Sequence, residues 1–489
     1  MMSTMQRRIN LFWLLEMTVW TGICVLFSLF IAKGGWVGGA GILAALMLFV
    51  MLTRYFHVLL CLWMAGIPTL FIFPNNVLHA ILSALTVDRI LYGILMATLL
   101  GSWLLKRSRP VPTTSVEKAM WVFLAVATLS LLSTTMTKPP KAVYDGFVML
   151  VQGVVMPYSA FVLAKNQVWT EKGMERFFLL LIGVGVYLTV AGVLQFFFQI
   201  TFFMPQYQYI EFDVEMDRAT GTFFSPTEYG GVLSVILMLT LLLYARAGDA
   251  VYRTALLGFS ALFTFAILLT KTRAVWVALL VALGVVCWKD RRVRAVLGIA
   301  AILGGVALIV ALPFLLNSEL FERRIAEQEP IYNRIAIYAT GLNMVIHNPI
   351  LGIGFGKDSF REAKGDYFAS FGDISAQWAS QPSVPHNELL LVLTLTGLVG
   401  LTAYLILLYR AYRLLDIAEV QSREKPMIRG ELACFLKAAF FVFVTTGMFS
   451  DLIFFIYYVM LLYFLLGMVA SPVPDGERGI QGQGPVVPV

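Results

Sequence analysis

The chain has 489 residues, of which 59% are hydrophobic and only 13% are charged, and its formal net charge is +7. Soluble domains carry about 25% charged residues, so this composition excludes a soluble globular protein and indicates a protein that faces lipid. The positive net charge does not indicate nucleic-acid binding, because the basic residues lie between apolar stretches rather than on one face. The four cysteines show neither metal-ligand nor disulfide spacing, and we interpret them as packing residues.

Many apolar stretches along the chain have close to the roughly 20 residues that a helix needs to cross a bilayer. They predict an all-α integral membrane protein, a polytopic helical bundle of about 14 transmembrane helices. The first stretch follows Arg7 and Arg8, and we expect it to remain as a membrane span rather than a cleaved signal peptide. The predicted spans are 11–32, 37–53, 55–73, 89–105, 117–136, 143–164, 176–200, 228–245, 253–270, 272–288, 294–315, 386–409, 430–449 and 451–469.

The distribution of basic residues predicts the orientation of these spans. With the N-terminus inside, the cytoplasmic segments hold 22 Lys and Arg, against six in the short outer loops. The positive-inside rule therefore places both termini in the cytoplasm. It leaves a large extracytoplasmic loop at 316–385, in which 333–346 has a helical pattern, and a cytoplasmic loop at 410–429. We expect one membrane domain over 1–470 and a disordered cytoplasmic tail, rich in Gly and Pro, over 471–489.

Two arginines at the predicted outer face are candidates for anion binding. Arg273 begins the span 272–288, and Arg334 follows Asn333, a candidate helix N-cap in the large loop. A guanidinium can hold two phosphate oxygens at once, and a helix N-terminus adds free N–H donors. The alternative interpretations are an interfacial anchor at Arg273 and a solvated surface charge at Arg334.

Alternating glycines follow Pro349 in the same loop, at Gly352, Gly354 and Gly356. Such a run favours turn formation. The alternative is a nest of backbone N–H groups that approaches a sugar or a phosphate closely.

His386 is the sharpest candidate for a catalytic residue. It begins the span 386–409 on the predicted outer side, and Gly397 and Gly400 follow it. On a straight helix Gly397 lies within about 20° of His386, and small residues on that face would permit close helix packing. A histidine at a helix N-terminus is favoured in its neutral form, which is the form a general base needs. The alternative is a histidine that merely caps the helix.

These motifs together resemble those of bacterial O-antigen ligases and the related O-antigen polymerases. His386-Asn387 with Gly397 and Gly400 resembles the histidine motif of that family. The stretch from Arg218 to Phe223, Thr272-Arg273 and the stretch from Pro349 to Gly354 are also similar to the family, in its order. The likeness covers about residues 218–400, whereas the first 200 residues match in hydropathy alone. Two departures from the family pattern leave open whether the chain is a ligase or a polymerase. It has about fourteen predicted spans where ligases usually have about twelve, and it has Lys271-Thr272 where a serine often precedes the arginine.

The resemblance implies a membrane glycosyltransferase of the GT-C type that uses neither a metal nor a cofactor and inverts the anomeric carbon. Its donor would be a glycan on a polyprenyl diphosphate such as undecaprenyl diphosphate. Its acceptor would be a hydroxyl of lipid A-core, of a growing polysaccharide or of a protein. The resemblance implies that His386 activates the acceptor, while Arg273 and Arg334 hold the diphosphate. The further candidate substrate-binding residues are Arg218, Gly352, Gly354 and Asn387.

The same resemblance places the site on the periplasmic or outer face of the bacterial cytoplasmic (inner) membrane. The alternative function is a multi-span transporter or flippase of lipid-linked glycans. Transporters tend to carry paired charges near the middle of the membrane. Here only Glu16 and Lys437 lie well inside the predicted spans, and the other polar candidates gather on one side. This one-sided distribution favours an enzyme.

Overall fold

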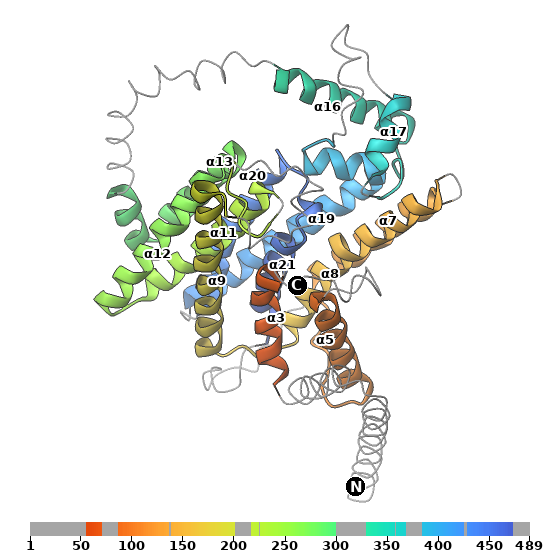
Figure 1. The fold of residues 1–489 in the computed structure, drawn as a ribbon. Helices are drawn as coiled ribbons and strands as arrows, with labels where there is room; N and C mark the ends of the chain where they lie inside the picture. Colours follow the sequence, from red (N-terminus) through yellow and green to blue (C-terminus); the bar gives the residue numbers. More distant parts are fainter. Residues whose placement is uncertain are drawn as a thin grey trace, which may run out of the picture.

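The computed structural model describes residues 55–70, 87–135, 138–200, 217–223, 225–299, 329–356, 358–367, 384–424 and 428–472. Every regular element in these ranges is helical, as the sequence predicts (Figure 1). The predicted spans 11–32 and 37–53, most of 294–315, and the tail from 473 onward lie outside the described residues. The helical class is therefore confirmed, and the number of fourteen spans stays a prediction.

The described helices follow the predicted spans closely from 55 to 289. Within the described ranges, six helical segments are long and apolar enough to cross a membrane. The elements are α3 (Phe56–Leu70), α5 (Val87–Leu104), α6 (Ser115–Ser133), α7 (Pro140–Leu150), the π-helix η1 (Val151–Val155), α8 (Met156–Lys165), α9 (Glu171–Phe198), α11 (Pro226–Arg246), α12 (Ala250–Leu269), α13 (Arg273–Lys289), α16 (Glu329–His347), α17 (Ser359–Tyr367), α19 (Glu388–Glu424), α20 (Ile428–Gly447), the 3₁₀ helix η2 (Leu452–Phe454) and α21 (Ile456–Ala470).

Several of these helices begin where local side chains satisfy their free N–H groups. Thr114 and Glu117 form a capping box at the start of α6, in which each side chain accepts a hydrogen bond from the other residue's backbone. Ser225 caps α11, and Pro226 occupies its first position, where the missing N–H has no cost. Local sequence therefore fixes these boundaries.

Three predicted boundaries are wrong. The helix that begins near 386 continues to Glu424, so most of the predicted 410–429 loop is helical. α16 begins at Glu329, so Asn333 lies inside the helix rather than at its N-cap. The last helix begins at Ile456, after a short 3₁₀ turn, rather than at 451. Apolar and helical patterns therefore locate these helices but not their exact first and last residues.

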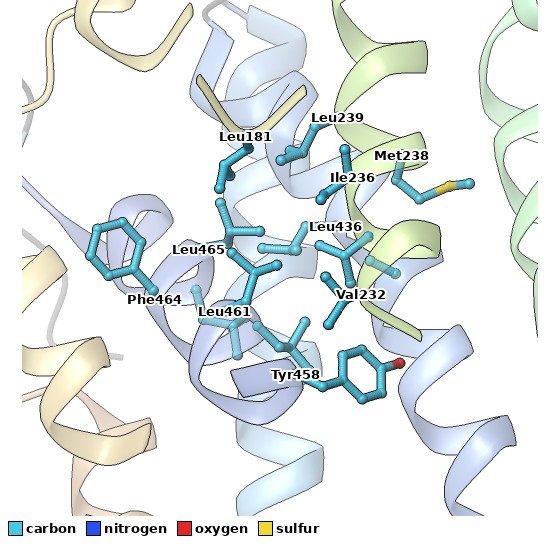
Figure 2. Packing of buried hydrophobic residues seen from close by; sticks show 14 of the residues in the cluster. Leu181, Val232, Ile236, Met238, Leu239, Leu436, Tyr458, Leu461, Phe464 and Leu465 are labelled. Atoms are coloured by element: carbon cyan, nitrogen blue, oxygen red, sulfur yellow. The ribbon is translucent and has the colours of Figure 1, made fainter. Parts of the chain in front are cut away.

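The hydrophobic core surrounds α11, which is buried along almost its whole length. Side chains of α9, α11, α20 and α21 interlock there, including Leu181, Ile236, Leu436 and Leu465 (Figure 2). A second cluster joins α6, α16, α17 and α19. α16 and α17 lie beside each other at the upper end of the view in Figure 1.

Polar contacts at the two ends of the bundle show which helix termini lie together. At one end Arg246 of α11 forms ion pairs with Glu171 of α9 at 3.3 Å and with Glu431 of α20 at 2.7 Å. At the other end Gln195, near the end of α9, binds the segment that precedes α11. We call this second end, which holds the starts of α11, α13, α19 and α21, the motif end.

Candidate active site

His386 lies at the motif end, directly before Asn387 and the start of α19 at Glu388, and it is not the helix cap. Asn387 is the cap, because its side-chain oxygen accepts a hydrogen bond from the N–H of Leu390 at 3.0 Å. The alternative reading of His386 as a capping histidine is therefore wrong. The backbone of His386 has φ +48°, in the left-handed region that a non-glycine residue occupies at a cost of roughly 1–2 kcal/mol.

A buried aspartate in the turn between α20 and α21 holds this backbone in place. Asp451 accepts hydrogen bonds from the N–H of His386 and the N–H of Asn387, both at 3.1 Å. Its Oδ2 also lies 3.5 Å from Nδ1 of His386. The side chain of Asp451 is 4% exposed, whereas that of His386 is 51% exposed. Asp451 thus fixes the imidazole on its Nδ1 side, and the rest of the ring is accessible.

The environment changes the acid–base properties of both groups. Burial raises the pKa of the Asp451 carboxyl to about 7. Partial burial of the imidazole, and to a lesser extent the charge of Arg334, lower the pKa of His386 from its ordinary value of 6.5. A lowered pKa keeps the imidazole neutral at neutral pH, which suits a general base.

Arg334, in the second turn of α16, is therefore close enough to His386 to act on its charge. Arg273 is the first residue of α13 at the same end of the bundle. Both side chains are exposed, and within the described residues neither makes a hydrogen bond or an ion pair. Two exposed guanidinium groups that pair with none of the described carboxylates are available to an anionic ligand.

Arg218 has a structural contact that the sequence did not reveal. Its guanidinium donates to the backbone oxygen of Thr270 at 3.1 Å and to the hydroxyl of Thr272 at 2.9 Å. These two threonines form the turn that leads into α13. Arg218 therefore positions the turn that carries Arg273.

The prediction that Gly397 shares a straight helix face with His386 is wrong. His386 lies outside the helix, and α19 is broken at Gly397, where φ is +67° and ψ is −168°. A Cβ at Gly397 would lie 2.2 Å from the backbone oxygen of Ile350. The glycine permits a close backbone contact with another segment, not close packing of two helices.

The segment with which it makes this contact is the glycine run after Pro349. Leu398 donates to the oxygen of Pro349 at 2.8 Å, and Ile353 donates to the oxygen of Thr394 at 2.9 Å. Gly352 and Gly354 have φ values of +69° and +97°, so the turn interpretation of this run is confirmed. These hydrogen bonds join the large loop to the break in α19. Binding of a ligand by Gly352, Gly354 or Asn387 stays a prediction.

Two site residues escaped the sequence analysis. Asp451 is the first residue of the predicted span 451–469, and Glu388 lies in the predicted span 386–409, directly after Asn387. Glu388 is buried and accepts hydrogen bonds from the N–H of Ile453 at 3.1 Å and from the hydroxyl of Tyr404 at 3.2 Å. The sequence feature that could have identified them is an acidic residue at the end of an apolar stretch with no Lys or Arg close to it in the chain.

The described residues contain no group of three or more His, Cys, Asp and Glu side chains arranged to hold a metal ion. Most of the acidic stretch before Arg218 lies outside these residues. The expected independence of metal ions and cofactors therefore stays a prediction.

The fold and the site together define a helical membrane protein with a histidine, an aspartate and an arginine gathered at one end of the bundle. Residues 258–405 match a protein-family model described as O-Antigen ligase, the family that the motifs resemble. The matched range contains Arg273, Arg334 and His386.

The chain is also similar to a protein of Rickettsia conorii described as a "Putative polysaccharide ligase". The two are 25% identical over 140 residues, which cover 29% of this chain and 33% of that protein. The chain thus matches about a third of the length of this relative. Both comparisons thus point to proteins described as O-antigen or polysaccharide ligases.

Proposed function

We propose that this chain is a membrane glycosyltransferase that moves a glycan from a polyprenyl-diphosphate carrier to an acceptor hydroxyl outside the cytoplasmic membrane. The proposal rests above all on the surroundings of His386. Its imidazole is half-exposed at the motif end, it is backed by buried Asp451, and its pKa is lowered by burial and by Arg334. The family match supports the same class of reaction.

In the proposed step, the acceptor hydroxyl attacks the anomeric carbon while its proton passes to the neutral imidazole of His386. The bond between the anomeric carbon and the diphosphate oxygen breaks, and the electron pair leaves with the polyprenyl diphosphate. The products are a new glycosidic bond of inverted configuration and the free carrier. Asp451 would stabilise the imidazolium that forms, as a carboxylate does beside other catalytic histidines.

Arg273 and Arg334 would bind the diphosphate and neutralise the charge that grows on it as it leaves. Preorganised cations of this kind stabilise a leaving group without a metal ion. Arg218 would act indirectly, because its hydrogen bonds at Thr270 and Thr272 position the turn before Arg273. Ligase and polymerase share this chemistry and differ in the acceptor.

A flippase of lipid-linked glycans is the alternative function. One observation bears on it: Asp416 and Glu419 lie within α19 and pair with Lys437 at 2.8 Å and 2.6 Å, so charges inside the helices are more numerous than the sequence suggested. These charges lie toward the end of the bundle opposite His386, whereas the matched motifs gather around it. The site geometry therefore favours transfer over transport.

The deciding experiment is transfer by the purified full-length chain in detergent micelles, where no second compartment exists. A polyprenyl-diphosphate-linked glycan and candidate acceptors are supplied, and the covalent product is followed by mass spectrometry. An enzyme forms a new glycoside and releases the carrier. Movement of the donor across vesicle membranes, with no product in micelles, would instead establish a flippase.

A further inference from the structure

A cavity of about 450 Å³ lies between α13, α19 and α20, far from His386. His386 precedes α19, whereas Tyr412 and Asp416 line the cavity near the other end of that helix, roughly 35 Å away along the helix path. The volume lies in the range of small-ligand sites, about 300–1,000 Å³. The cavity is therefore separate from the candidate active site.

The walls of the cavity are apolar, and its polar groups gather at one end. Val281, Val285 and Phe441 supply part of the apolar wall. At Gly284 an added Cβ would meet no atom within 4 Å, so the cavity opens past this glycine. The outward surface of α13 continues with exposed Val277 and Val281, the kind of surface that faces acyl chains. An occupant of this cavity thus needs an apolar part.

The polar end carries an excess of positive charge. Lys437 is buried and pairs with Asp416 and Glu419, and its ammonium lies 5.5 Å from the ring centre of Tyr412. Lys289 pairs with Glu419 at 2.6 Å, and Arg413 lies 3.5 Å from Asp416. Three cations therefore surround two anions.

Lys289 is the group best placed to bind a ligand at this end. Its ammonium has three donors, and within the described residues Glu419 is its one acceptor. Its side chain is 32% exposed at the rim of the cavity. Arg294 adds positive charge beside it, because its guanidinium binds the backbone oxygens of Cys287 and Trp288.

We propose that this cavity binds an anionic diacyl phospholipid of the phosphatidylglycerol type. The phosphate would contact the free donors of Lys289, and an acyl chain would lie along Val281, Gly284 and Val285. Basic pockets between membrane helices bind anionic headgroups in this way. A free phosphate would leave the apolar walls without a partner, so we commit to the lipid. The inference is independent of the proposed glycan transfer.

The test is native mass spectrometry of the delipidated full-length chain with added phosphatidylglycerol, or with phosphatidylethanolamine of the same acyl chains. Two variants probe the site: Lys289→Gln removes the donor, and Gly284→Leu fills the cavity. Two matched controls carry the same changes elsewhere. Lys172→Gln alters an exposed lysine at the start of α9, and Gly258→Leu alters a glycine of α12 with equally open surroundings.

We expect phosphatidylglycerol to be retained about tenfold more strongly than phosphatidylethanolamine, and each site variant to lose about that factor, since a hydrogen bond to a charged group is removed or blocked. The controls should bind as the parent does, and glycerol phosphate without acyl chains should not compete. Equal retention of the two lipids, or unchanged retention in Lys289→Gln, would overturn the proposal. Lys289→Gln remains decisive if Gly284→Leu does not fold.

Discussion

Nδ1 of His386 lies 3.5 Å from Oδ2 of Asp451, although the two residues are 65 positions apart in the chain. The same carboxylate accepts the backbone N–H of His386 and so holds a residue whose φ is +48°. A strained histidine fixed by a buried acid is an arrangement typical of functional sites.

His386→Ala should lower the rate of glycan transfer by about 10²–10⁴-fold, the usual contribution of a general base. Donor binding and protein abundance should remain near those of the parent, because the helix cap is Asn387 and not His386. Single-turnover transfer by the purified protein measures the effect. His347→Ala, at another exposed histidine, is the matched control, and equal losses in both variants would remove the catalytic role.

Activity should fall as pH decreases through the pKa of His386, because protonation removes the base. Burial and Arg334 lower that pKa, so the midpoint due to His386 should lie below 6.5, and below a first decrease near pH 7 where Asp451 becomes protonated. Arg334→Gln removes one of these two causes. The midpoint should therefore move to higher pH, toward 6.5, in a profile of kcat/KM. A midpoint that does not move in Arg334→Gln would show that Arg334 does not act on the histidine.

Asp451→Asn should lower turnover roughly ten- to hundredfold, which corresponds to a lost charge-assisted contact of about 1.5–3 kcal/mol. An amide has one oxygen to accept the two N–H donors of His386 and Asn387, and it cannot stabilise an imidazolium by charge. The midpoint of the acid limb should change as well, which a purely structural role would not cause. Asp249→Asn, at the cap of α12, serves as the control.

Arg273→Lys and Arg334→Lys should each lose most glycan transfer while the protein reaches the membrane in normal amount. A planar guanidinium can hold two phosphate oxygens, and an ammonium cannot reproduce that geometry. The Michaelis constant for the donor should rise by about tenfold or more. Arg176→Lys, at an exposed arginine of α9, should transfer normally. If cells with either site variant make glycan product in the wild-type amount, that arginine serves only as an interfacial anchor.

Gly397→Ala should destabilise the protein by about 1–3 kcal/mol, since alanine is strained at positive φ. Its Cβ would also lie 2.2 Å from the backbone oxygen of Ile350. The loss should appear as a lower thermal unfolding midpoint in detergent. Gly258→Ala is the control, because open surroundings and a helical backbone make alanine neutral or favourable there. If the two variants have the same thermal unfolding midpoint, the close contact is not essential to the fold.

The sequence by itself determined that the chain faces lipid, that it is helical, and where most of its helices lie. Long apolar stretches can satisfy their backbone groups in a bilayer only as helices, and caps such as Thr114 and Ser225 act over three residues. It also located His386, Arg273 and Arg334, because their motifs are local and ordered along the chain. These features need no knowledge of distant contacts.

The tertiary structure decided what surrounds those residues. Asp451 reaches His386, Arg218 reaches Thr270, and the Pro349 segment meets the break at Gly397, all across separations that a periodic pattern does not encode. In the extension of α19 to Glu424, Asp416 and Glu419 likewise pair with Lys437 of α20. A buried carboxylate is tolerated only where distant donors meet it, and only the packed bundle brings those donors together.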